Sequence, residues 1–210
     1  MTSLESETGL GPDGAAALRL TQALATRLCH DLAGAVFTLA GALELAEEDA
    51  DSLALAREAS GVLQARLRLL RAAWGQAETT LSGAALGALL AGVPLGRRMA
   101  LRLEGLDPSL SLQAEQARLV LCLALLGAES LHGEGELWVS QPDAVHLQIA
   151  ISGRNAAWPE EFASMLAGDV FGFAAPLEPR DLVAPLCALQ ARQERISLRV
   201  LPDRLILRLS

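Results

Sequence analysis

The sequence predicts an α+β protein, in which an N-terminal antiparallel helical hairpin precedes a C-terminal two-layer α/β sandwich. Residues 13–48 and 51–74 repeat apolar side chains at steps of three and four, the spacing of helices. Leu and Ala, both strong helix formers, supply most of the apolar content. Past residue 77 the pattern changes to short alternating strands mixed with helices. We therefore place a hairpin domain at residues 1–76 and an α/β domain at residues 77–210.

The composition favours a globular protein and argues against a nucleic-acid-binding or membrane-spanning one. The 210 residues are 51% apolar, which is typical of a globular protein, and the net charge of −8 argues against nucleic acid as a partner. No stretch reaches the roughly 18 uninterrupted apolar residues of a membrane span, and residues 1–14 lack the layout of a signal peptide. Cys29, Cys122 and Cys187 are widely spaced and form no CxxC pair. We expect a cytoplasmic protein with no membrane contact.

The hairpin carries more apolar surface than it can bury alone. One set of apolar positions in the first helix points in a single direction: Leu28, Leu32, Val36, Leu39 and Leu43. The second helix carries two separate apolar lines, one of Leu55, Val62 and Leu69 and one of Ala56, Leu63 and Leu70. Residues 47–51 form an acidic turn between the helices, and Asp51 or Ser52 can cap the second helix. The economical solution is a homodimer whose two hairpins form a four-helix bundle.

The α/β domain has its own series of elements. Ser82 can cap a short helix that ends near residue 91. Residues 112–131 form the most apolar segment and predict a buried helix. Five strands are expected in all, at residues 99–103, 136–140, 145–151, 196–201 and 204–209, and two further helices within 159–166 and 180–195. This mixture of helices and mostly antiparallel strands predicts a two-layer sandwich.

His30 is predicted to point into solvent from the first helix. At about 100° per residue it lies roughly opposite the apolar direction. The same face carries Phe37, a large apolar side chain that is unfavourable in contact with water. It also carries Gly34 and Gly41, each of which lowers helix stability by roughly 1 kcal/mol relative to Ala in a helix interior. A docking partner would account for all three. The alternative is that His30 is an ordinary surface histidine and Phe37 packs on the neighbouring hairpin.

An exposed imidazole can accept a phosphoryl group reversibly, because its ring nitrogen is a good nucleophile near neutral pH. The group would move in line from a carboxylate of the partner, whose own Mg²⁺ would neutralise charge. Asp31 can accept the other ring N–H and fix the tautomer, or assist the proton transfer. Arg27 lies one turn earlier and can offset the charge of the phosphate.

Several segments together resemble ChpT-type histidine phosphotransferases. The RLCHDL sequence of residues 27–32, with Gly34 and residues 43–45 behind it, is similar to the phosphoacceptor helix of that family. Residues 118–136 resemble the family's buried helix with its Ala-Glu-Ser/Ala-Leu sequence and glycine-bearing turn, and residues 176–209 agree in outline. The resemblance covers most of the chain, and the RLCHD motif is its most specific part.

The resemblance implies a homodimer whose second domain is similar to a histidine-kinase ATP-binding domain that no longer binds nucleotide. It implies that phosphoryl groups pass between His30, with Asp31 as the adjacent acid, and aspartates of receiver domains in hybrid kinases and response regulators. Cys122 and apolar neighbours stand where a kinase helix carries an Asn for nucleotide and metal, and residues 151–155 lack an Asp-x-Gly-x-Gly loop. We expect no ATP, no other cofactor and no metal in the chain itself.

Two other functions remain open from the sequence. An autophosphorylating sensor kinase would need the nucleotide-binding motifs that are missing. A dimeric interaction module could bind receiver domains or kinases without carrying phosphate, and only His30 separates it from a phosphoryl carrier. His132 and His146 are interpreted as structural residues.

Overall fold

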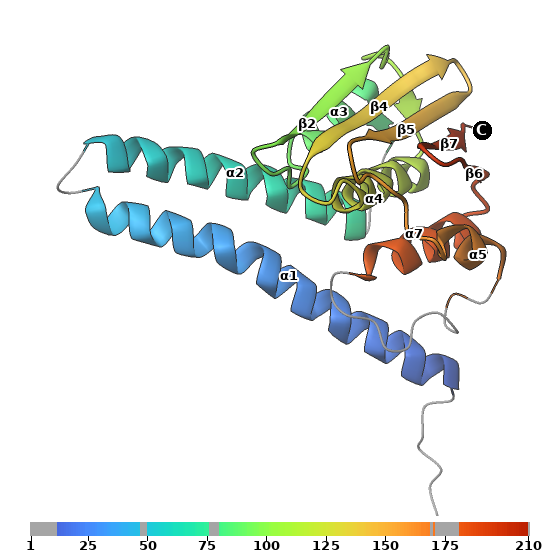
Figure 1. The fold of residues 1–210 in the computed structure, drawn as a ribbon, viewed down its shortest axis with the longest axis horizontal. Coiled ribbons are helices and arrows are strands. Elements are labelled where there is room, and N and C mark those ends of the chain that lie inside the picture. Colours follow the sequence, from blue (N-terminus) through green and yellow to red (C-terminus); the bar gives the residue numbers. More distant parts are fainter. Residues whose placement is uncertain (1–11, 47–49, 76–79, 169, 171–180, 210) are drawn as a thin grey trace, which may run out of the picture.

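Two long antiparallel helices make up the first part of the chain, as the sequence predicts (Figure 1). In the computed structural model, α1 spans Pro12–Leu45 and α2 spans Ala50–Trp74. Because α2 begins before Asp51, this residue lies in the first helical turn, where a carboxylate is favourable. The described residues are 12–46, 50–75, 80–168, 170 and 181–209. The centre of the predicted acidic turn and the predicted domain boundary both lie outside these ranges, and the boundary stays a prediction.

The apolar residues of α1 divide between two faces, which the sequence pattern treated as one. Leu20 and Ala42 are buried, whereas Val36 and Leu43 are about half exposed. The single apolar direction taken from the sequence is therefore an average of two faces. One face is buried within the chain, and the other is exposed. A side chain on the open face gains no hydrophobic stabilisation until another surface covers it.

The α/β domain follows the hairpin and contains the predicted elements in the predicted order. Its helices are α3 Gly83–Leu90, α4 Ala114–Ser130, α5 Phe162–Ala167 and α7 Val183–Gln193. Its strands are β1 Leu81–Ser82, β2 Met99–Glu104, β3 Ser111–Leu112, β4 Gly135–Asp143, β5 His146–Ser152, β6 Leu198–Val200 and β7 Arg204–Arg208. Ser82 caps α3 as predicted, because its side chain accepts a hydrogen bond from the Ala85 backbone N–H at 3.2 Å.

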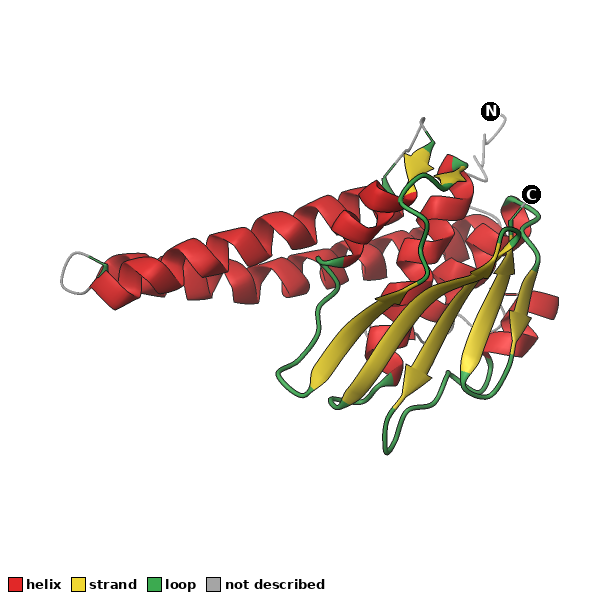
Figure 2. Cartoon of the chain, turned by 90° about the horizontal axis from the view of Figure 1, so that it is seen from above, coloured by secondary structure: helices red, strands yellow, loops and turns green. Residues whose placement is uncertain are grey.

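Five strands form one sheet in the order β2-β4-β5-β7-β6, and β1 pairs with β3 separately. The pair β2–β4 is parallel, and the other pairs of the sheet are antiparallel. Leu137 and Val139 alternate along β4 with the half-buried Trp138, so one face of the sheet is the core face. The helices of the domain lie on that side of the sheet, which gives the two-layer sandwich (Figure 2).

Helix α4 is the centre of the core. Most of its residues are buried, and it contacts α2, α7 and the sheet. Gly127 lies where α4 meets the sheet, and a Cβ there would lie 2.5 Å from the Cδ1 of Leu137, so that this side chain would have to move. On the opposite side of α4, Leu69 and Ala73 of α2 are fully buried. The hairpin is thus anchored to the α/β domain through the second half of α2.

The predicted line of Leu55, Val62 and Leu69 on α2 is divided by this anchor. Leu69 is covered within the chain, whereas Leu55 and Val62 are 51% and 50% exposed. The α/β domain therefore covers Leu69, a residue that the sequence analysis expected a second hairpin to cover. It leaves the half of the hairpin near the turn without cover in the single chain.

The segment Gly14–Leu45 of α1 is long and apolar enough, by length and composition alone, to cross a membrane. Core helices of soluble proteins and signal sequences meet the same criterion. Only 6% of its apolar window is buried in the chain. The helix nevertheless carries Arg27, which forms an ion pair with Glu129 of α4, and such charges are expensive inside a bilayer. The single chain thus leaves most of the apolar surface of α1 exposed.

Candidate functional site

His30 lies on α1 with its side chain exposed to solvent, as the helical phase predicts. Its side chain is 85% exposed, and it is held on a helix with neighbouring turns on both sides. An imidazole in this position keeps its orientation relative to the helix, while its far nitrogen is open to a second protein. The arrangement is suited to a reaction in which a partner brings its own reactive group.

Asp31 lies beside His30, and its two carboxylate oxygens contact different residues. Its Oδ1 is 3.4 Å from the Nδ1 of His30, and its Oδ2 accepts a hydrogen bond of 2.7 Å from the Nε of Arg27. The first distance is at the outer limit for a hydrogen bond, and catalytic hydrogen bonds are often long before a partner binds. Arg66 of α2 donates to the backbone carbonyl of Asp31 at 3.3 Å and ties this turn to the second helix.

Arg27 points inward, so the structure gives it a different place from the predicted partner surface. Its side chain is only 14% exposed, and its Nη2 donates to the Oε1 of Glu129 on α4 at 2.5 Å. Burial alone would lower the pKa of Arg27, but the hydrogen bonds and charges of Asp31 and Glu129 raise it above its ordinary value. Arg27 therefore stays charged and connects the helix of His30 to the α/β domain.

Glu129 is a site residue that the sequence analysis missed. Burial raises the pKa of its carboxyl group to about 7, in spite of the opposing charge and hydrogen bond of Arg27. The signal in the sequence is that Glu129 is the one charged residue between positions 119 and 131. A lone carboxylate in an apolar helix needs a cationic partner, but the pattern along α4 does not show that Arg27 supplies it.

Phe37, Gly34 and Gly41 lie on the same side of α1 as His30. The side chain of Phe37 is 75% exposed and is not covered within the chain. A Cβ added at Gly34 or Gly41 would meet nothing within 4 Å, so neither glycine is required by packing inside the chain. Phe37 is about 10 Å along the helix from His30. These residues form an open apolar face next to the imidazole, which we call the His30 face.

The cysteines of α4 and α7 lie in the core of the α/β domain. Cys122 is fully buried on α4, and its Sγ lies 3.5 Å from the backbone carbonyl oxygen of Ala73 on α2. The neighbouring thiol of Cys187 on α7 is also buried, and burial raises its pKa. Within the described residues, no group of His, Cys, Asp and Glu side chains could hold a metal ion.

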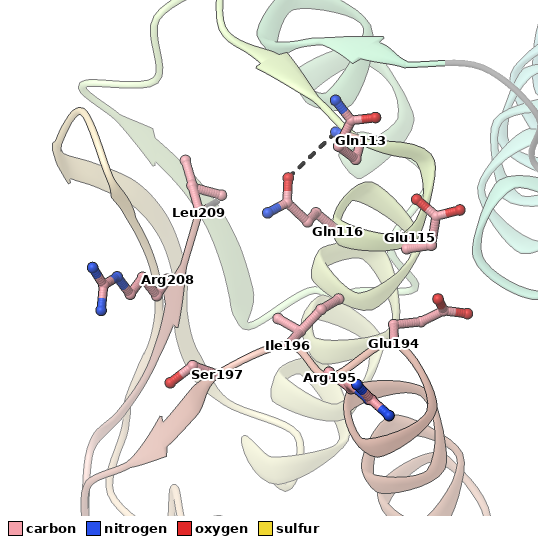
Figure 3. Close-up of a pocket in the computed structure, with 9 residues that line it drawn as sticks. All are labelled: Gln113, Glu115, Gln116, Glu194, Arg195, Ile196, Ser197, Arg208 and Leu209. Atoms are coloured by element: carbon pink, nitrogen blue, oxygen red, sulfur yellow. Dashed lines mark hydrogen bonds between the residues drawn. The ribbon is translucent and has the colours of Figure 1, made fainter.

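A hollow lies at the other end of α4 (Figure 3). Gln113 and Gln116 line it from the start of this helix, residues 194–197 from the segment after α7, and Arg208 from β7. The start of α4 is about 24 Å along the helix from Glu129, so this hollow is separate from the His30 face. Both carboxylate and guanidinium groups line it, which gives it no single sign of charge.

The comparisons with known proteins agree with this architecture. A solved structure described as a bacterial phosphotransferase is 24% identical, with a TM-score of 0.65 over 92% of this chain and 97% of that chain, and shows the shared fold. The histidine kinase domain of the blue-light activated kinase EL346 of Erythrobacter litoralis is 13% identical, with a TM-score of 0.44 over 84% of this chain and 95% of that chain. No curated protein matches the chain.

The family comparison covers more than half of the chain. The model of the histidine phosphotransferase C-terminal domain matches residues 84–204, which include every element of the α/β domain from α3 to the start of β7. The matched range includes Glu129, and it begins after the hairpin that carries His30. With both the match and the hairpin-plus-sandwich fold in place, the chain belongs to the histidine phosphotransferase family.

Proposed function

We propose that this family member is a cytoplasmic phosphoryl carrier that accepts a phosphoryl group on His30 from a receiver-domain aspartate. It then passes the group to response regulators without using ATP. The observation that carries the proposal is an imidazole that is 85% exposed on a helix and has a carboxylate beside its inner nitrogen. The cytoplasmic location is suggested by three cysteines that form no disulfide.

The contact between His30 and Asp31 selects the nitrogen that reacts. When Asp31 accepts a hydrogen bond from Nδ1–H, the lone pair of the neutral imidazole is on Nε2, which faces solvent. In the transfer, the P–O bond of the aspartyl phosphate breaks and a P–N bond forms at Nε2. The proton stays on Nδ1, where Asp31 offsets the positive charge that develops on the ring.

The partner would dock on the His30 face. Phe37 offers an exposed aromatic side chain, and aromatic residues often anchor protein interfaces. The open space at Gly34 and Gly41 lets a partner helix approach the backbone of α1 closely. The partner's receiver domain would carry the Mg²⁺ that neutralises charge during transfer, as these phosphoryl transfers require.

A second copy of the chain would cover the remaining apolar surface of the hairpin. Besides Phe37, exposed large apolar residues continue along both helices: Leu18, Val36, Leu43 and Leu45 on α1, and Leu53, Leu55, Val62 and Leu67 on α2. Two hairpins packed through these residues would form a four-helix bundle. The arrangement leaves His30 accessible, because its direction on α1 differs from that of Val36 and Leu43 by more than 90°.

Removal of the imidazole tests the proposal most directly. His30→Gln should abolish transfer from a phosphorylated receiver domain and leave thermal unfolding nearly unchanged, because the side chain buries little surface. His132→Gln is the matched control, since this histidine is also exposed but lies in the turn after α4. Acid-labile phosphohistidine is the quantity to measure.

The result separates the three functions that the sequence left open. Transfer that persists in His30→Gln would overturn the assignment. Binding of receiver domains without labelling of the wild type would favour the phosphate-free interaction module. Labelling by radioactive ATP in the presence of Mg²⁺ would restore the sensor kinase.

A further inference from the structure

Glu129 occupies a position where a carboxylate is unfavourable. It lies in the last turn of α4, and a negative charge there opposes the helix dipole. Its side chain is only 27% exposed, so ionisation also carries a cost of desolvation. Groups placed at such a cost are frequently part of functional sites.

The charged and titratable groups that face Glu129 come from two directions. Arg27 and Asp31 face it from α1, and Asp181 faces it from the residues just before α7. The buried thiol of Cys187 on α7 is also within electrostatic range. Among these described groups Arg27 is the cation, so it is the group that holds Glu129 in its ionised form.

A continuous series of contacts joins Glu129 to the imidazole. The Nη2 of Arg27 is 2.5 Å from Glu129 Oε1, and the Nε of Arg27 is 2.7 Å from Asp31 Oδ2. The other oxygen of the same carboxylate, Oδ1, is 3.4 Å from His30 Nδ1. Each member of the series therefore uses a different atom for each neighbour.

The geometry of the guanidinium group explains why Glu129 affects Asp31. An arginine side chain can offer Nε and Nη2 together as a fork that binds both oxygens of one carboxylate. Here the two nitrogens are divided between the two carboxylates: Nη2 donates to Glu129 and Nε donates to Asp31. One oxygen of Asp31 is consequently left for His30. Without Glu129, the Nη2 of Arg27 can turn towards Asp31, and binding through both nitrogens of the fork would draw Oδ1 away from the imidazole.

We propose that Glu129 is a positioning residue of the phosphotransfer site, which acts through Arg27 to keep one carboxylate oxygen of Asp31 on the Nδ1 of His30. The inference rests on the proposed function of His30. It gives the α/β domain, through α4, a part in the transfer although the acceptor lies in the hairpin. Glu129 itself exchanges no proton or electron with the reacting groups.

Glu129→Gln in the full-length protein tests this, with Glu194→Gln as the matched control. Glu194 forms a similar ion pair with Arg118 of α4, at 3.5 Å and with similar exposure, but at the other end of the helix. Near pH 8, Glu129→Gln should slow transfer from a phosphorylated receiver domain about five- to tenfold, as expected for a displaced catalytic group. Glu194→Gln should transfer at the wild-type rate.

The pH profile provides a readout that a merely structural role would not change. The ratio of wild-type to Glu129→Gln rates should fall towards one below about pH 6, because the wild-type carboxyl group, with a pKa of about 7, is then protonated and resembles glutamine. A ratio that stays flat across this range would overturn the proposal.

Two further measurements keep the proposal testable if Glu129→Gln is less stable. In an Arg27→Gln background, Glu129→Gln should cause no further loss of rate, whereas an equal loss in both backgrounds contradicts action through Arg27. Nitrogen NMR of the His30 imidazole should show the Nδ1–H tautomer in the wild type and a mixture in Glu129→Gln. Unchanged tautomers would overturn the inference without any transfer assay. Failure of the proposed function itself appears differently, as transfer that survives His30→Gln.

Discussion

At the base of the hairpin, near Leu69, α2 is covered by the α/β domain, whereas at its tip, near Leu55 and Val62, the same apolar line is open. Leu69 and Ala73 are fully buried, and Leu55 and Val62 are about half exposed. The two ends have the same kind of side chain and the same helical spacing. The difference comes from what lies opposite them: α3 and α4 at the base and solvent at the tip. The same sequence pattern thus packs within the chain in one place and leaves apolar side chains exposed in the other.

The base should respond most strongly to a loss of volume. Leu69→Ala removes a fully buried side chain at the junction with α4, and such cavities cost about 2–5 kcal/mol. Chemical denaturation should show this loss in the free energy of unfolding. Leu55→Ala at the tip is the control and should change the unfolding of the monomer by far less. Equal losses at the two positions would show that the tip is covered within the chain.

A charge introduced at the tip should weaken dimerisation and leave the folding of the single chain nearly unchanged. Val62→Glu places a carboxylate in the proposed interface between hairpins, and an unpaired buried charge costs about 3 kcal/mol or more. Sedimentation should show a dimer of the wild type at micromolar concentration and a monomer of the variant, with little change in helix content. A wild type that sediments as a folded monomer would refute the bundle.

The His30 face lies between the base and the tip. A substitution there should weaken binding of the partner and leave the stability of the fold unchanged. Phe37→Ala should weaken binding of a receiver domain by about 1–3 kcal/mol, as for a buried aromatic anchor, because Phe37 is 75% exposed in the free chain. Calorimetry of binding and the melting temperature together give the answer. A fall in melting temperature with unchanged binding would place Phe37 inside the dimer.

The ion pair at the base makes a smaller and pH-dependent contribution to stability. The pKa of Glu129 is about 7 in the folded protein against 4.5 for an ordinary glutamate. Between these values the folded state binds more protons than the unfolded state, so this carboxyl group makes the protein less stable as pH rises. Relative to wild type, Glu129→Gln should gain at most about 2 kcal/mol in unfolding free energy between about pH 5.5 and 8.

In Glu129→Gln, this gain in stability is expected to accompany a loss of transfer rate. Leu69→Ala differs, because it is expected to lose stability. Denaturation curves of both proteins across the pH range provide the measurement. A difference that is independent of pH would mean that Glu129 is ionised throughout, with an ordinary pKa.

Local sequence patterns were sufficient for the elements and for the direction of His30. The steps of three and four along α1 place His30 opposite Leu28 and Leu39, and its side chain is exposed. Ser82 caps α3, and the buried α4 and the hairpin of β4 and β5 lie where their patterns predict. Helical phase, capping and alternation depend on residues a few positions apart, which is why the sequence determines them.

Tertiary structure decided which apolar residues are covered and how the site is completed. Arg27 and Glu129 are 102 positions apart, and each by itself is only a charge on a helix. Their contact exists because α2 docks on α4 and brings α1 with it, so no pattern within one helix contains it. The same docking buries Leu69 and leaves Val62 open, although both lie on one line of α2. Burial depends on the surface that faces a residue, and only the packed chain supplies that surface.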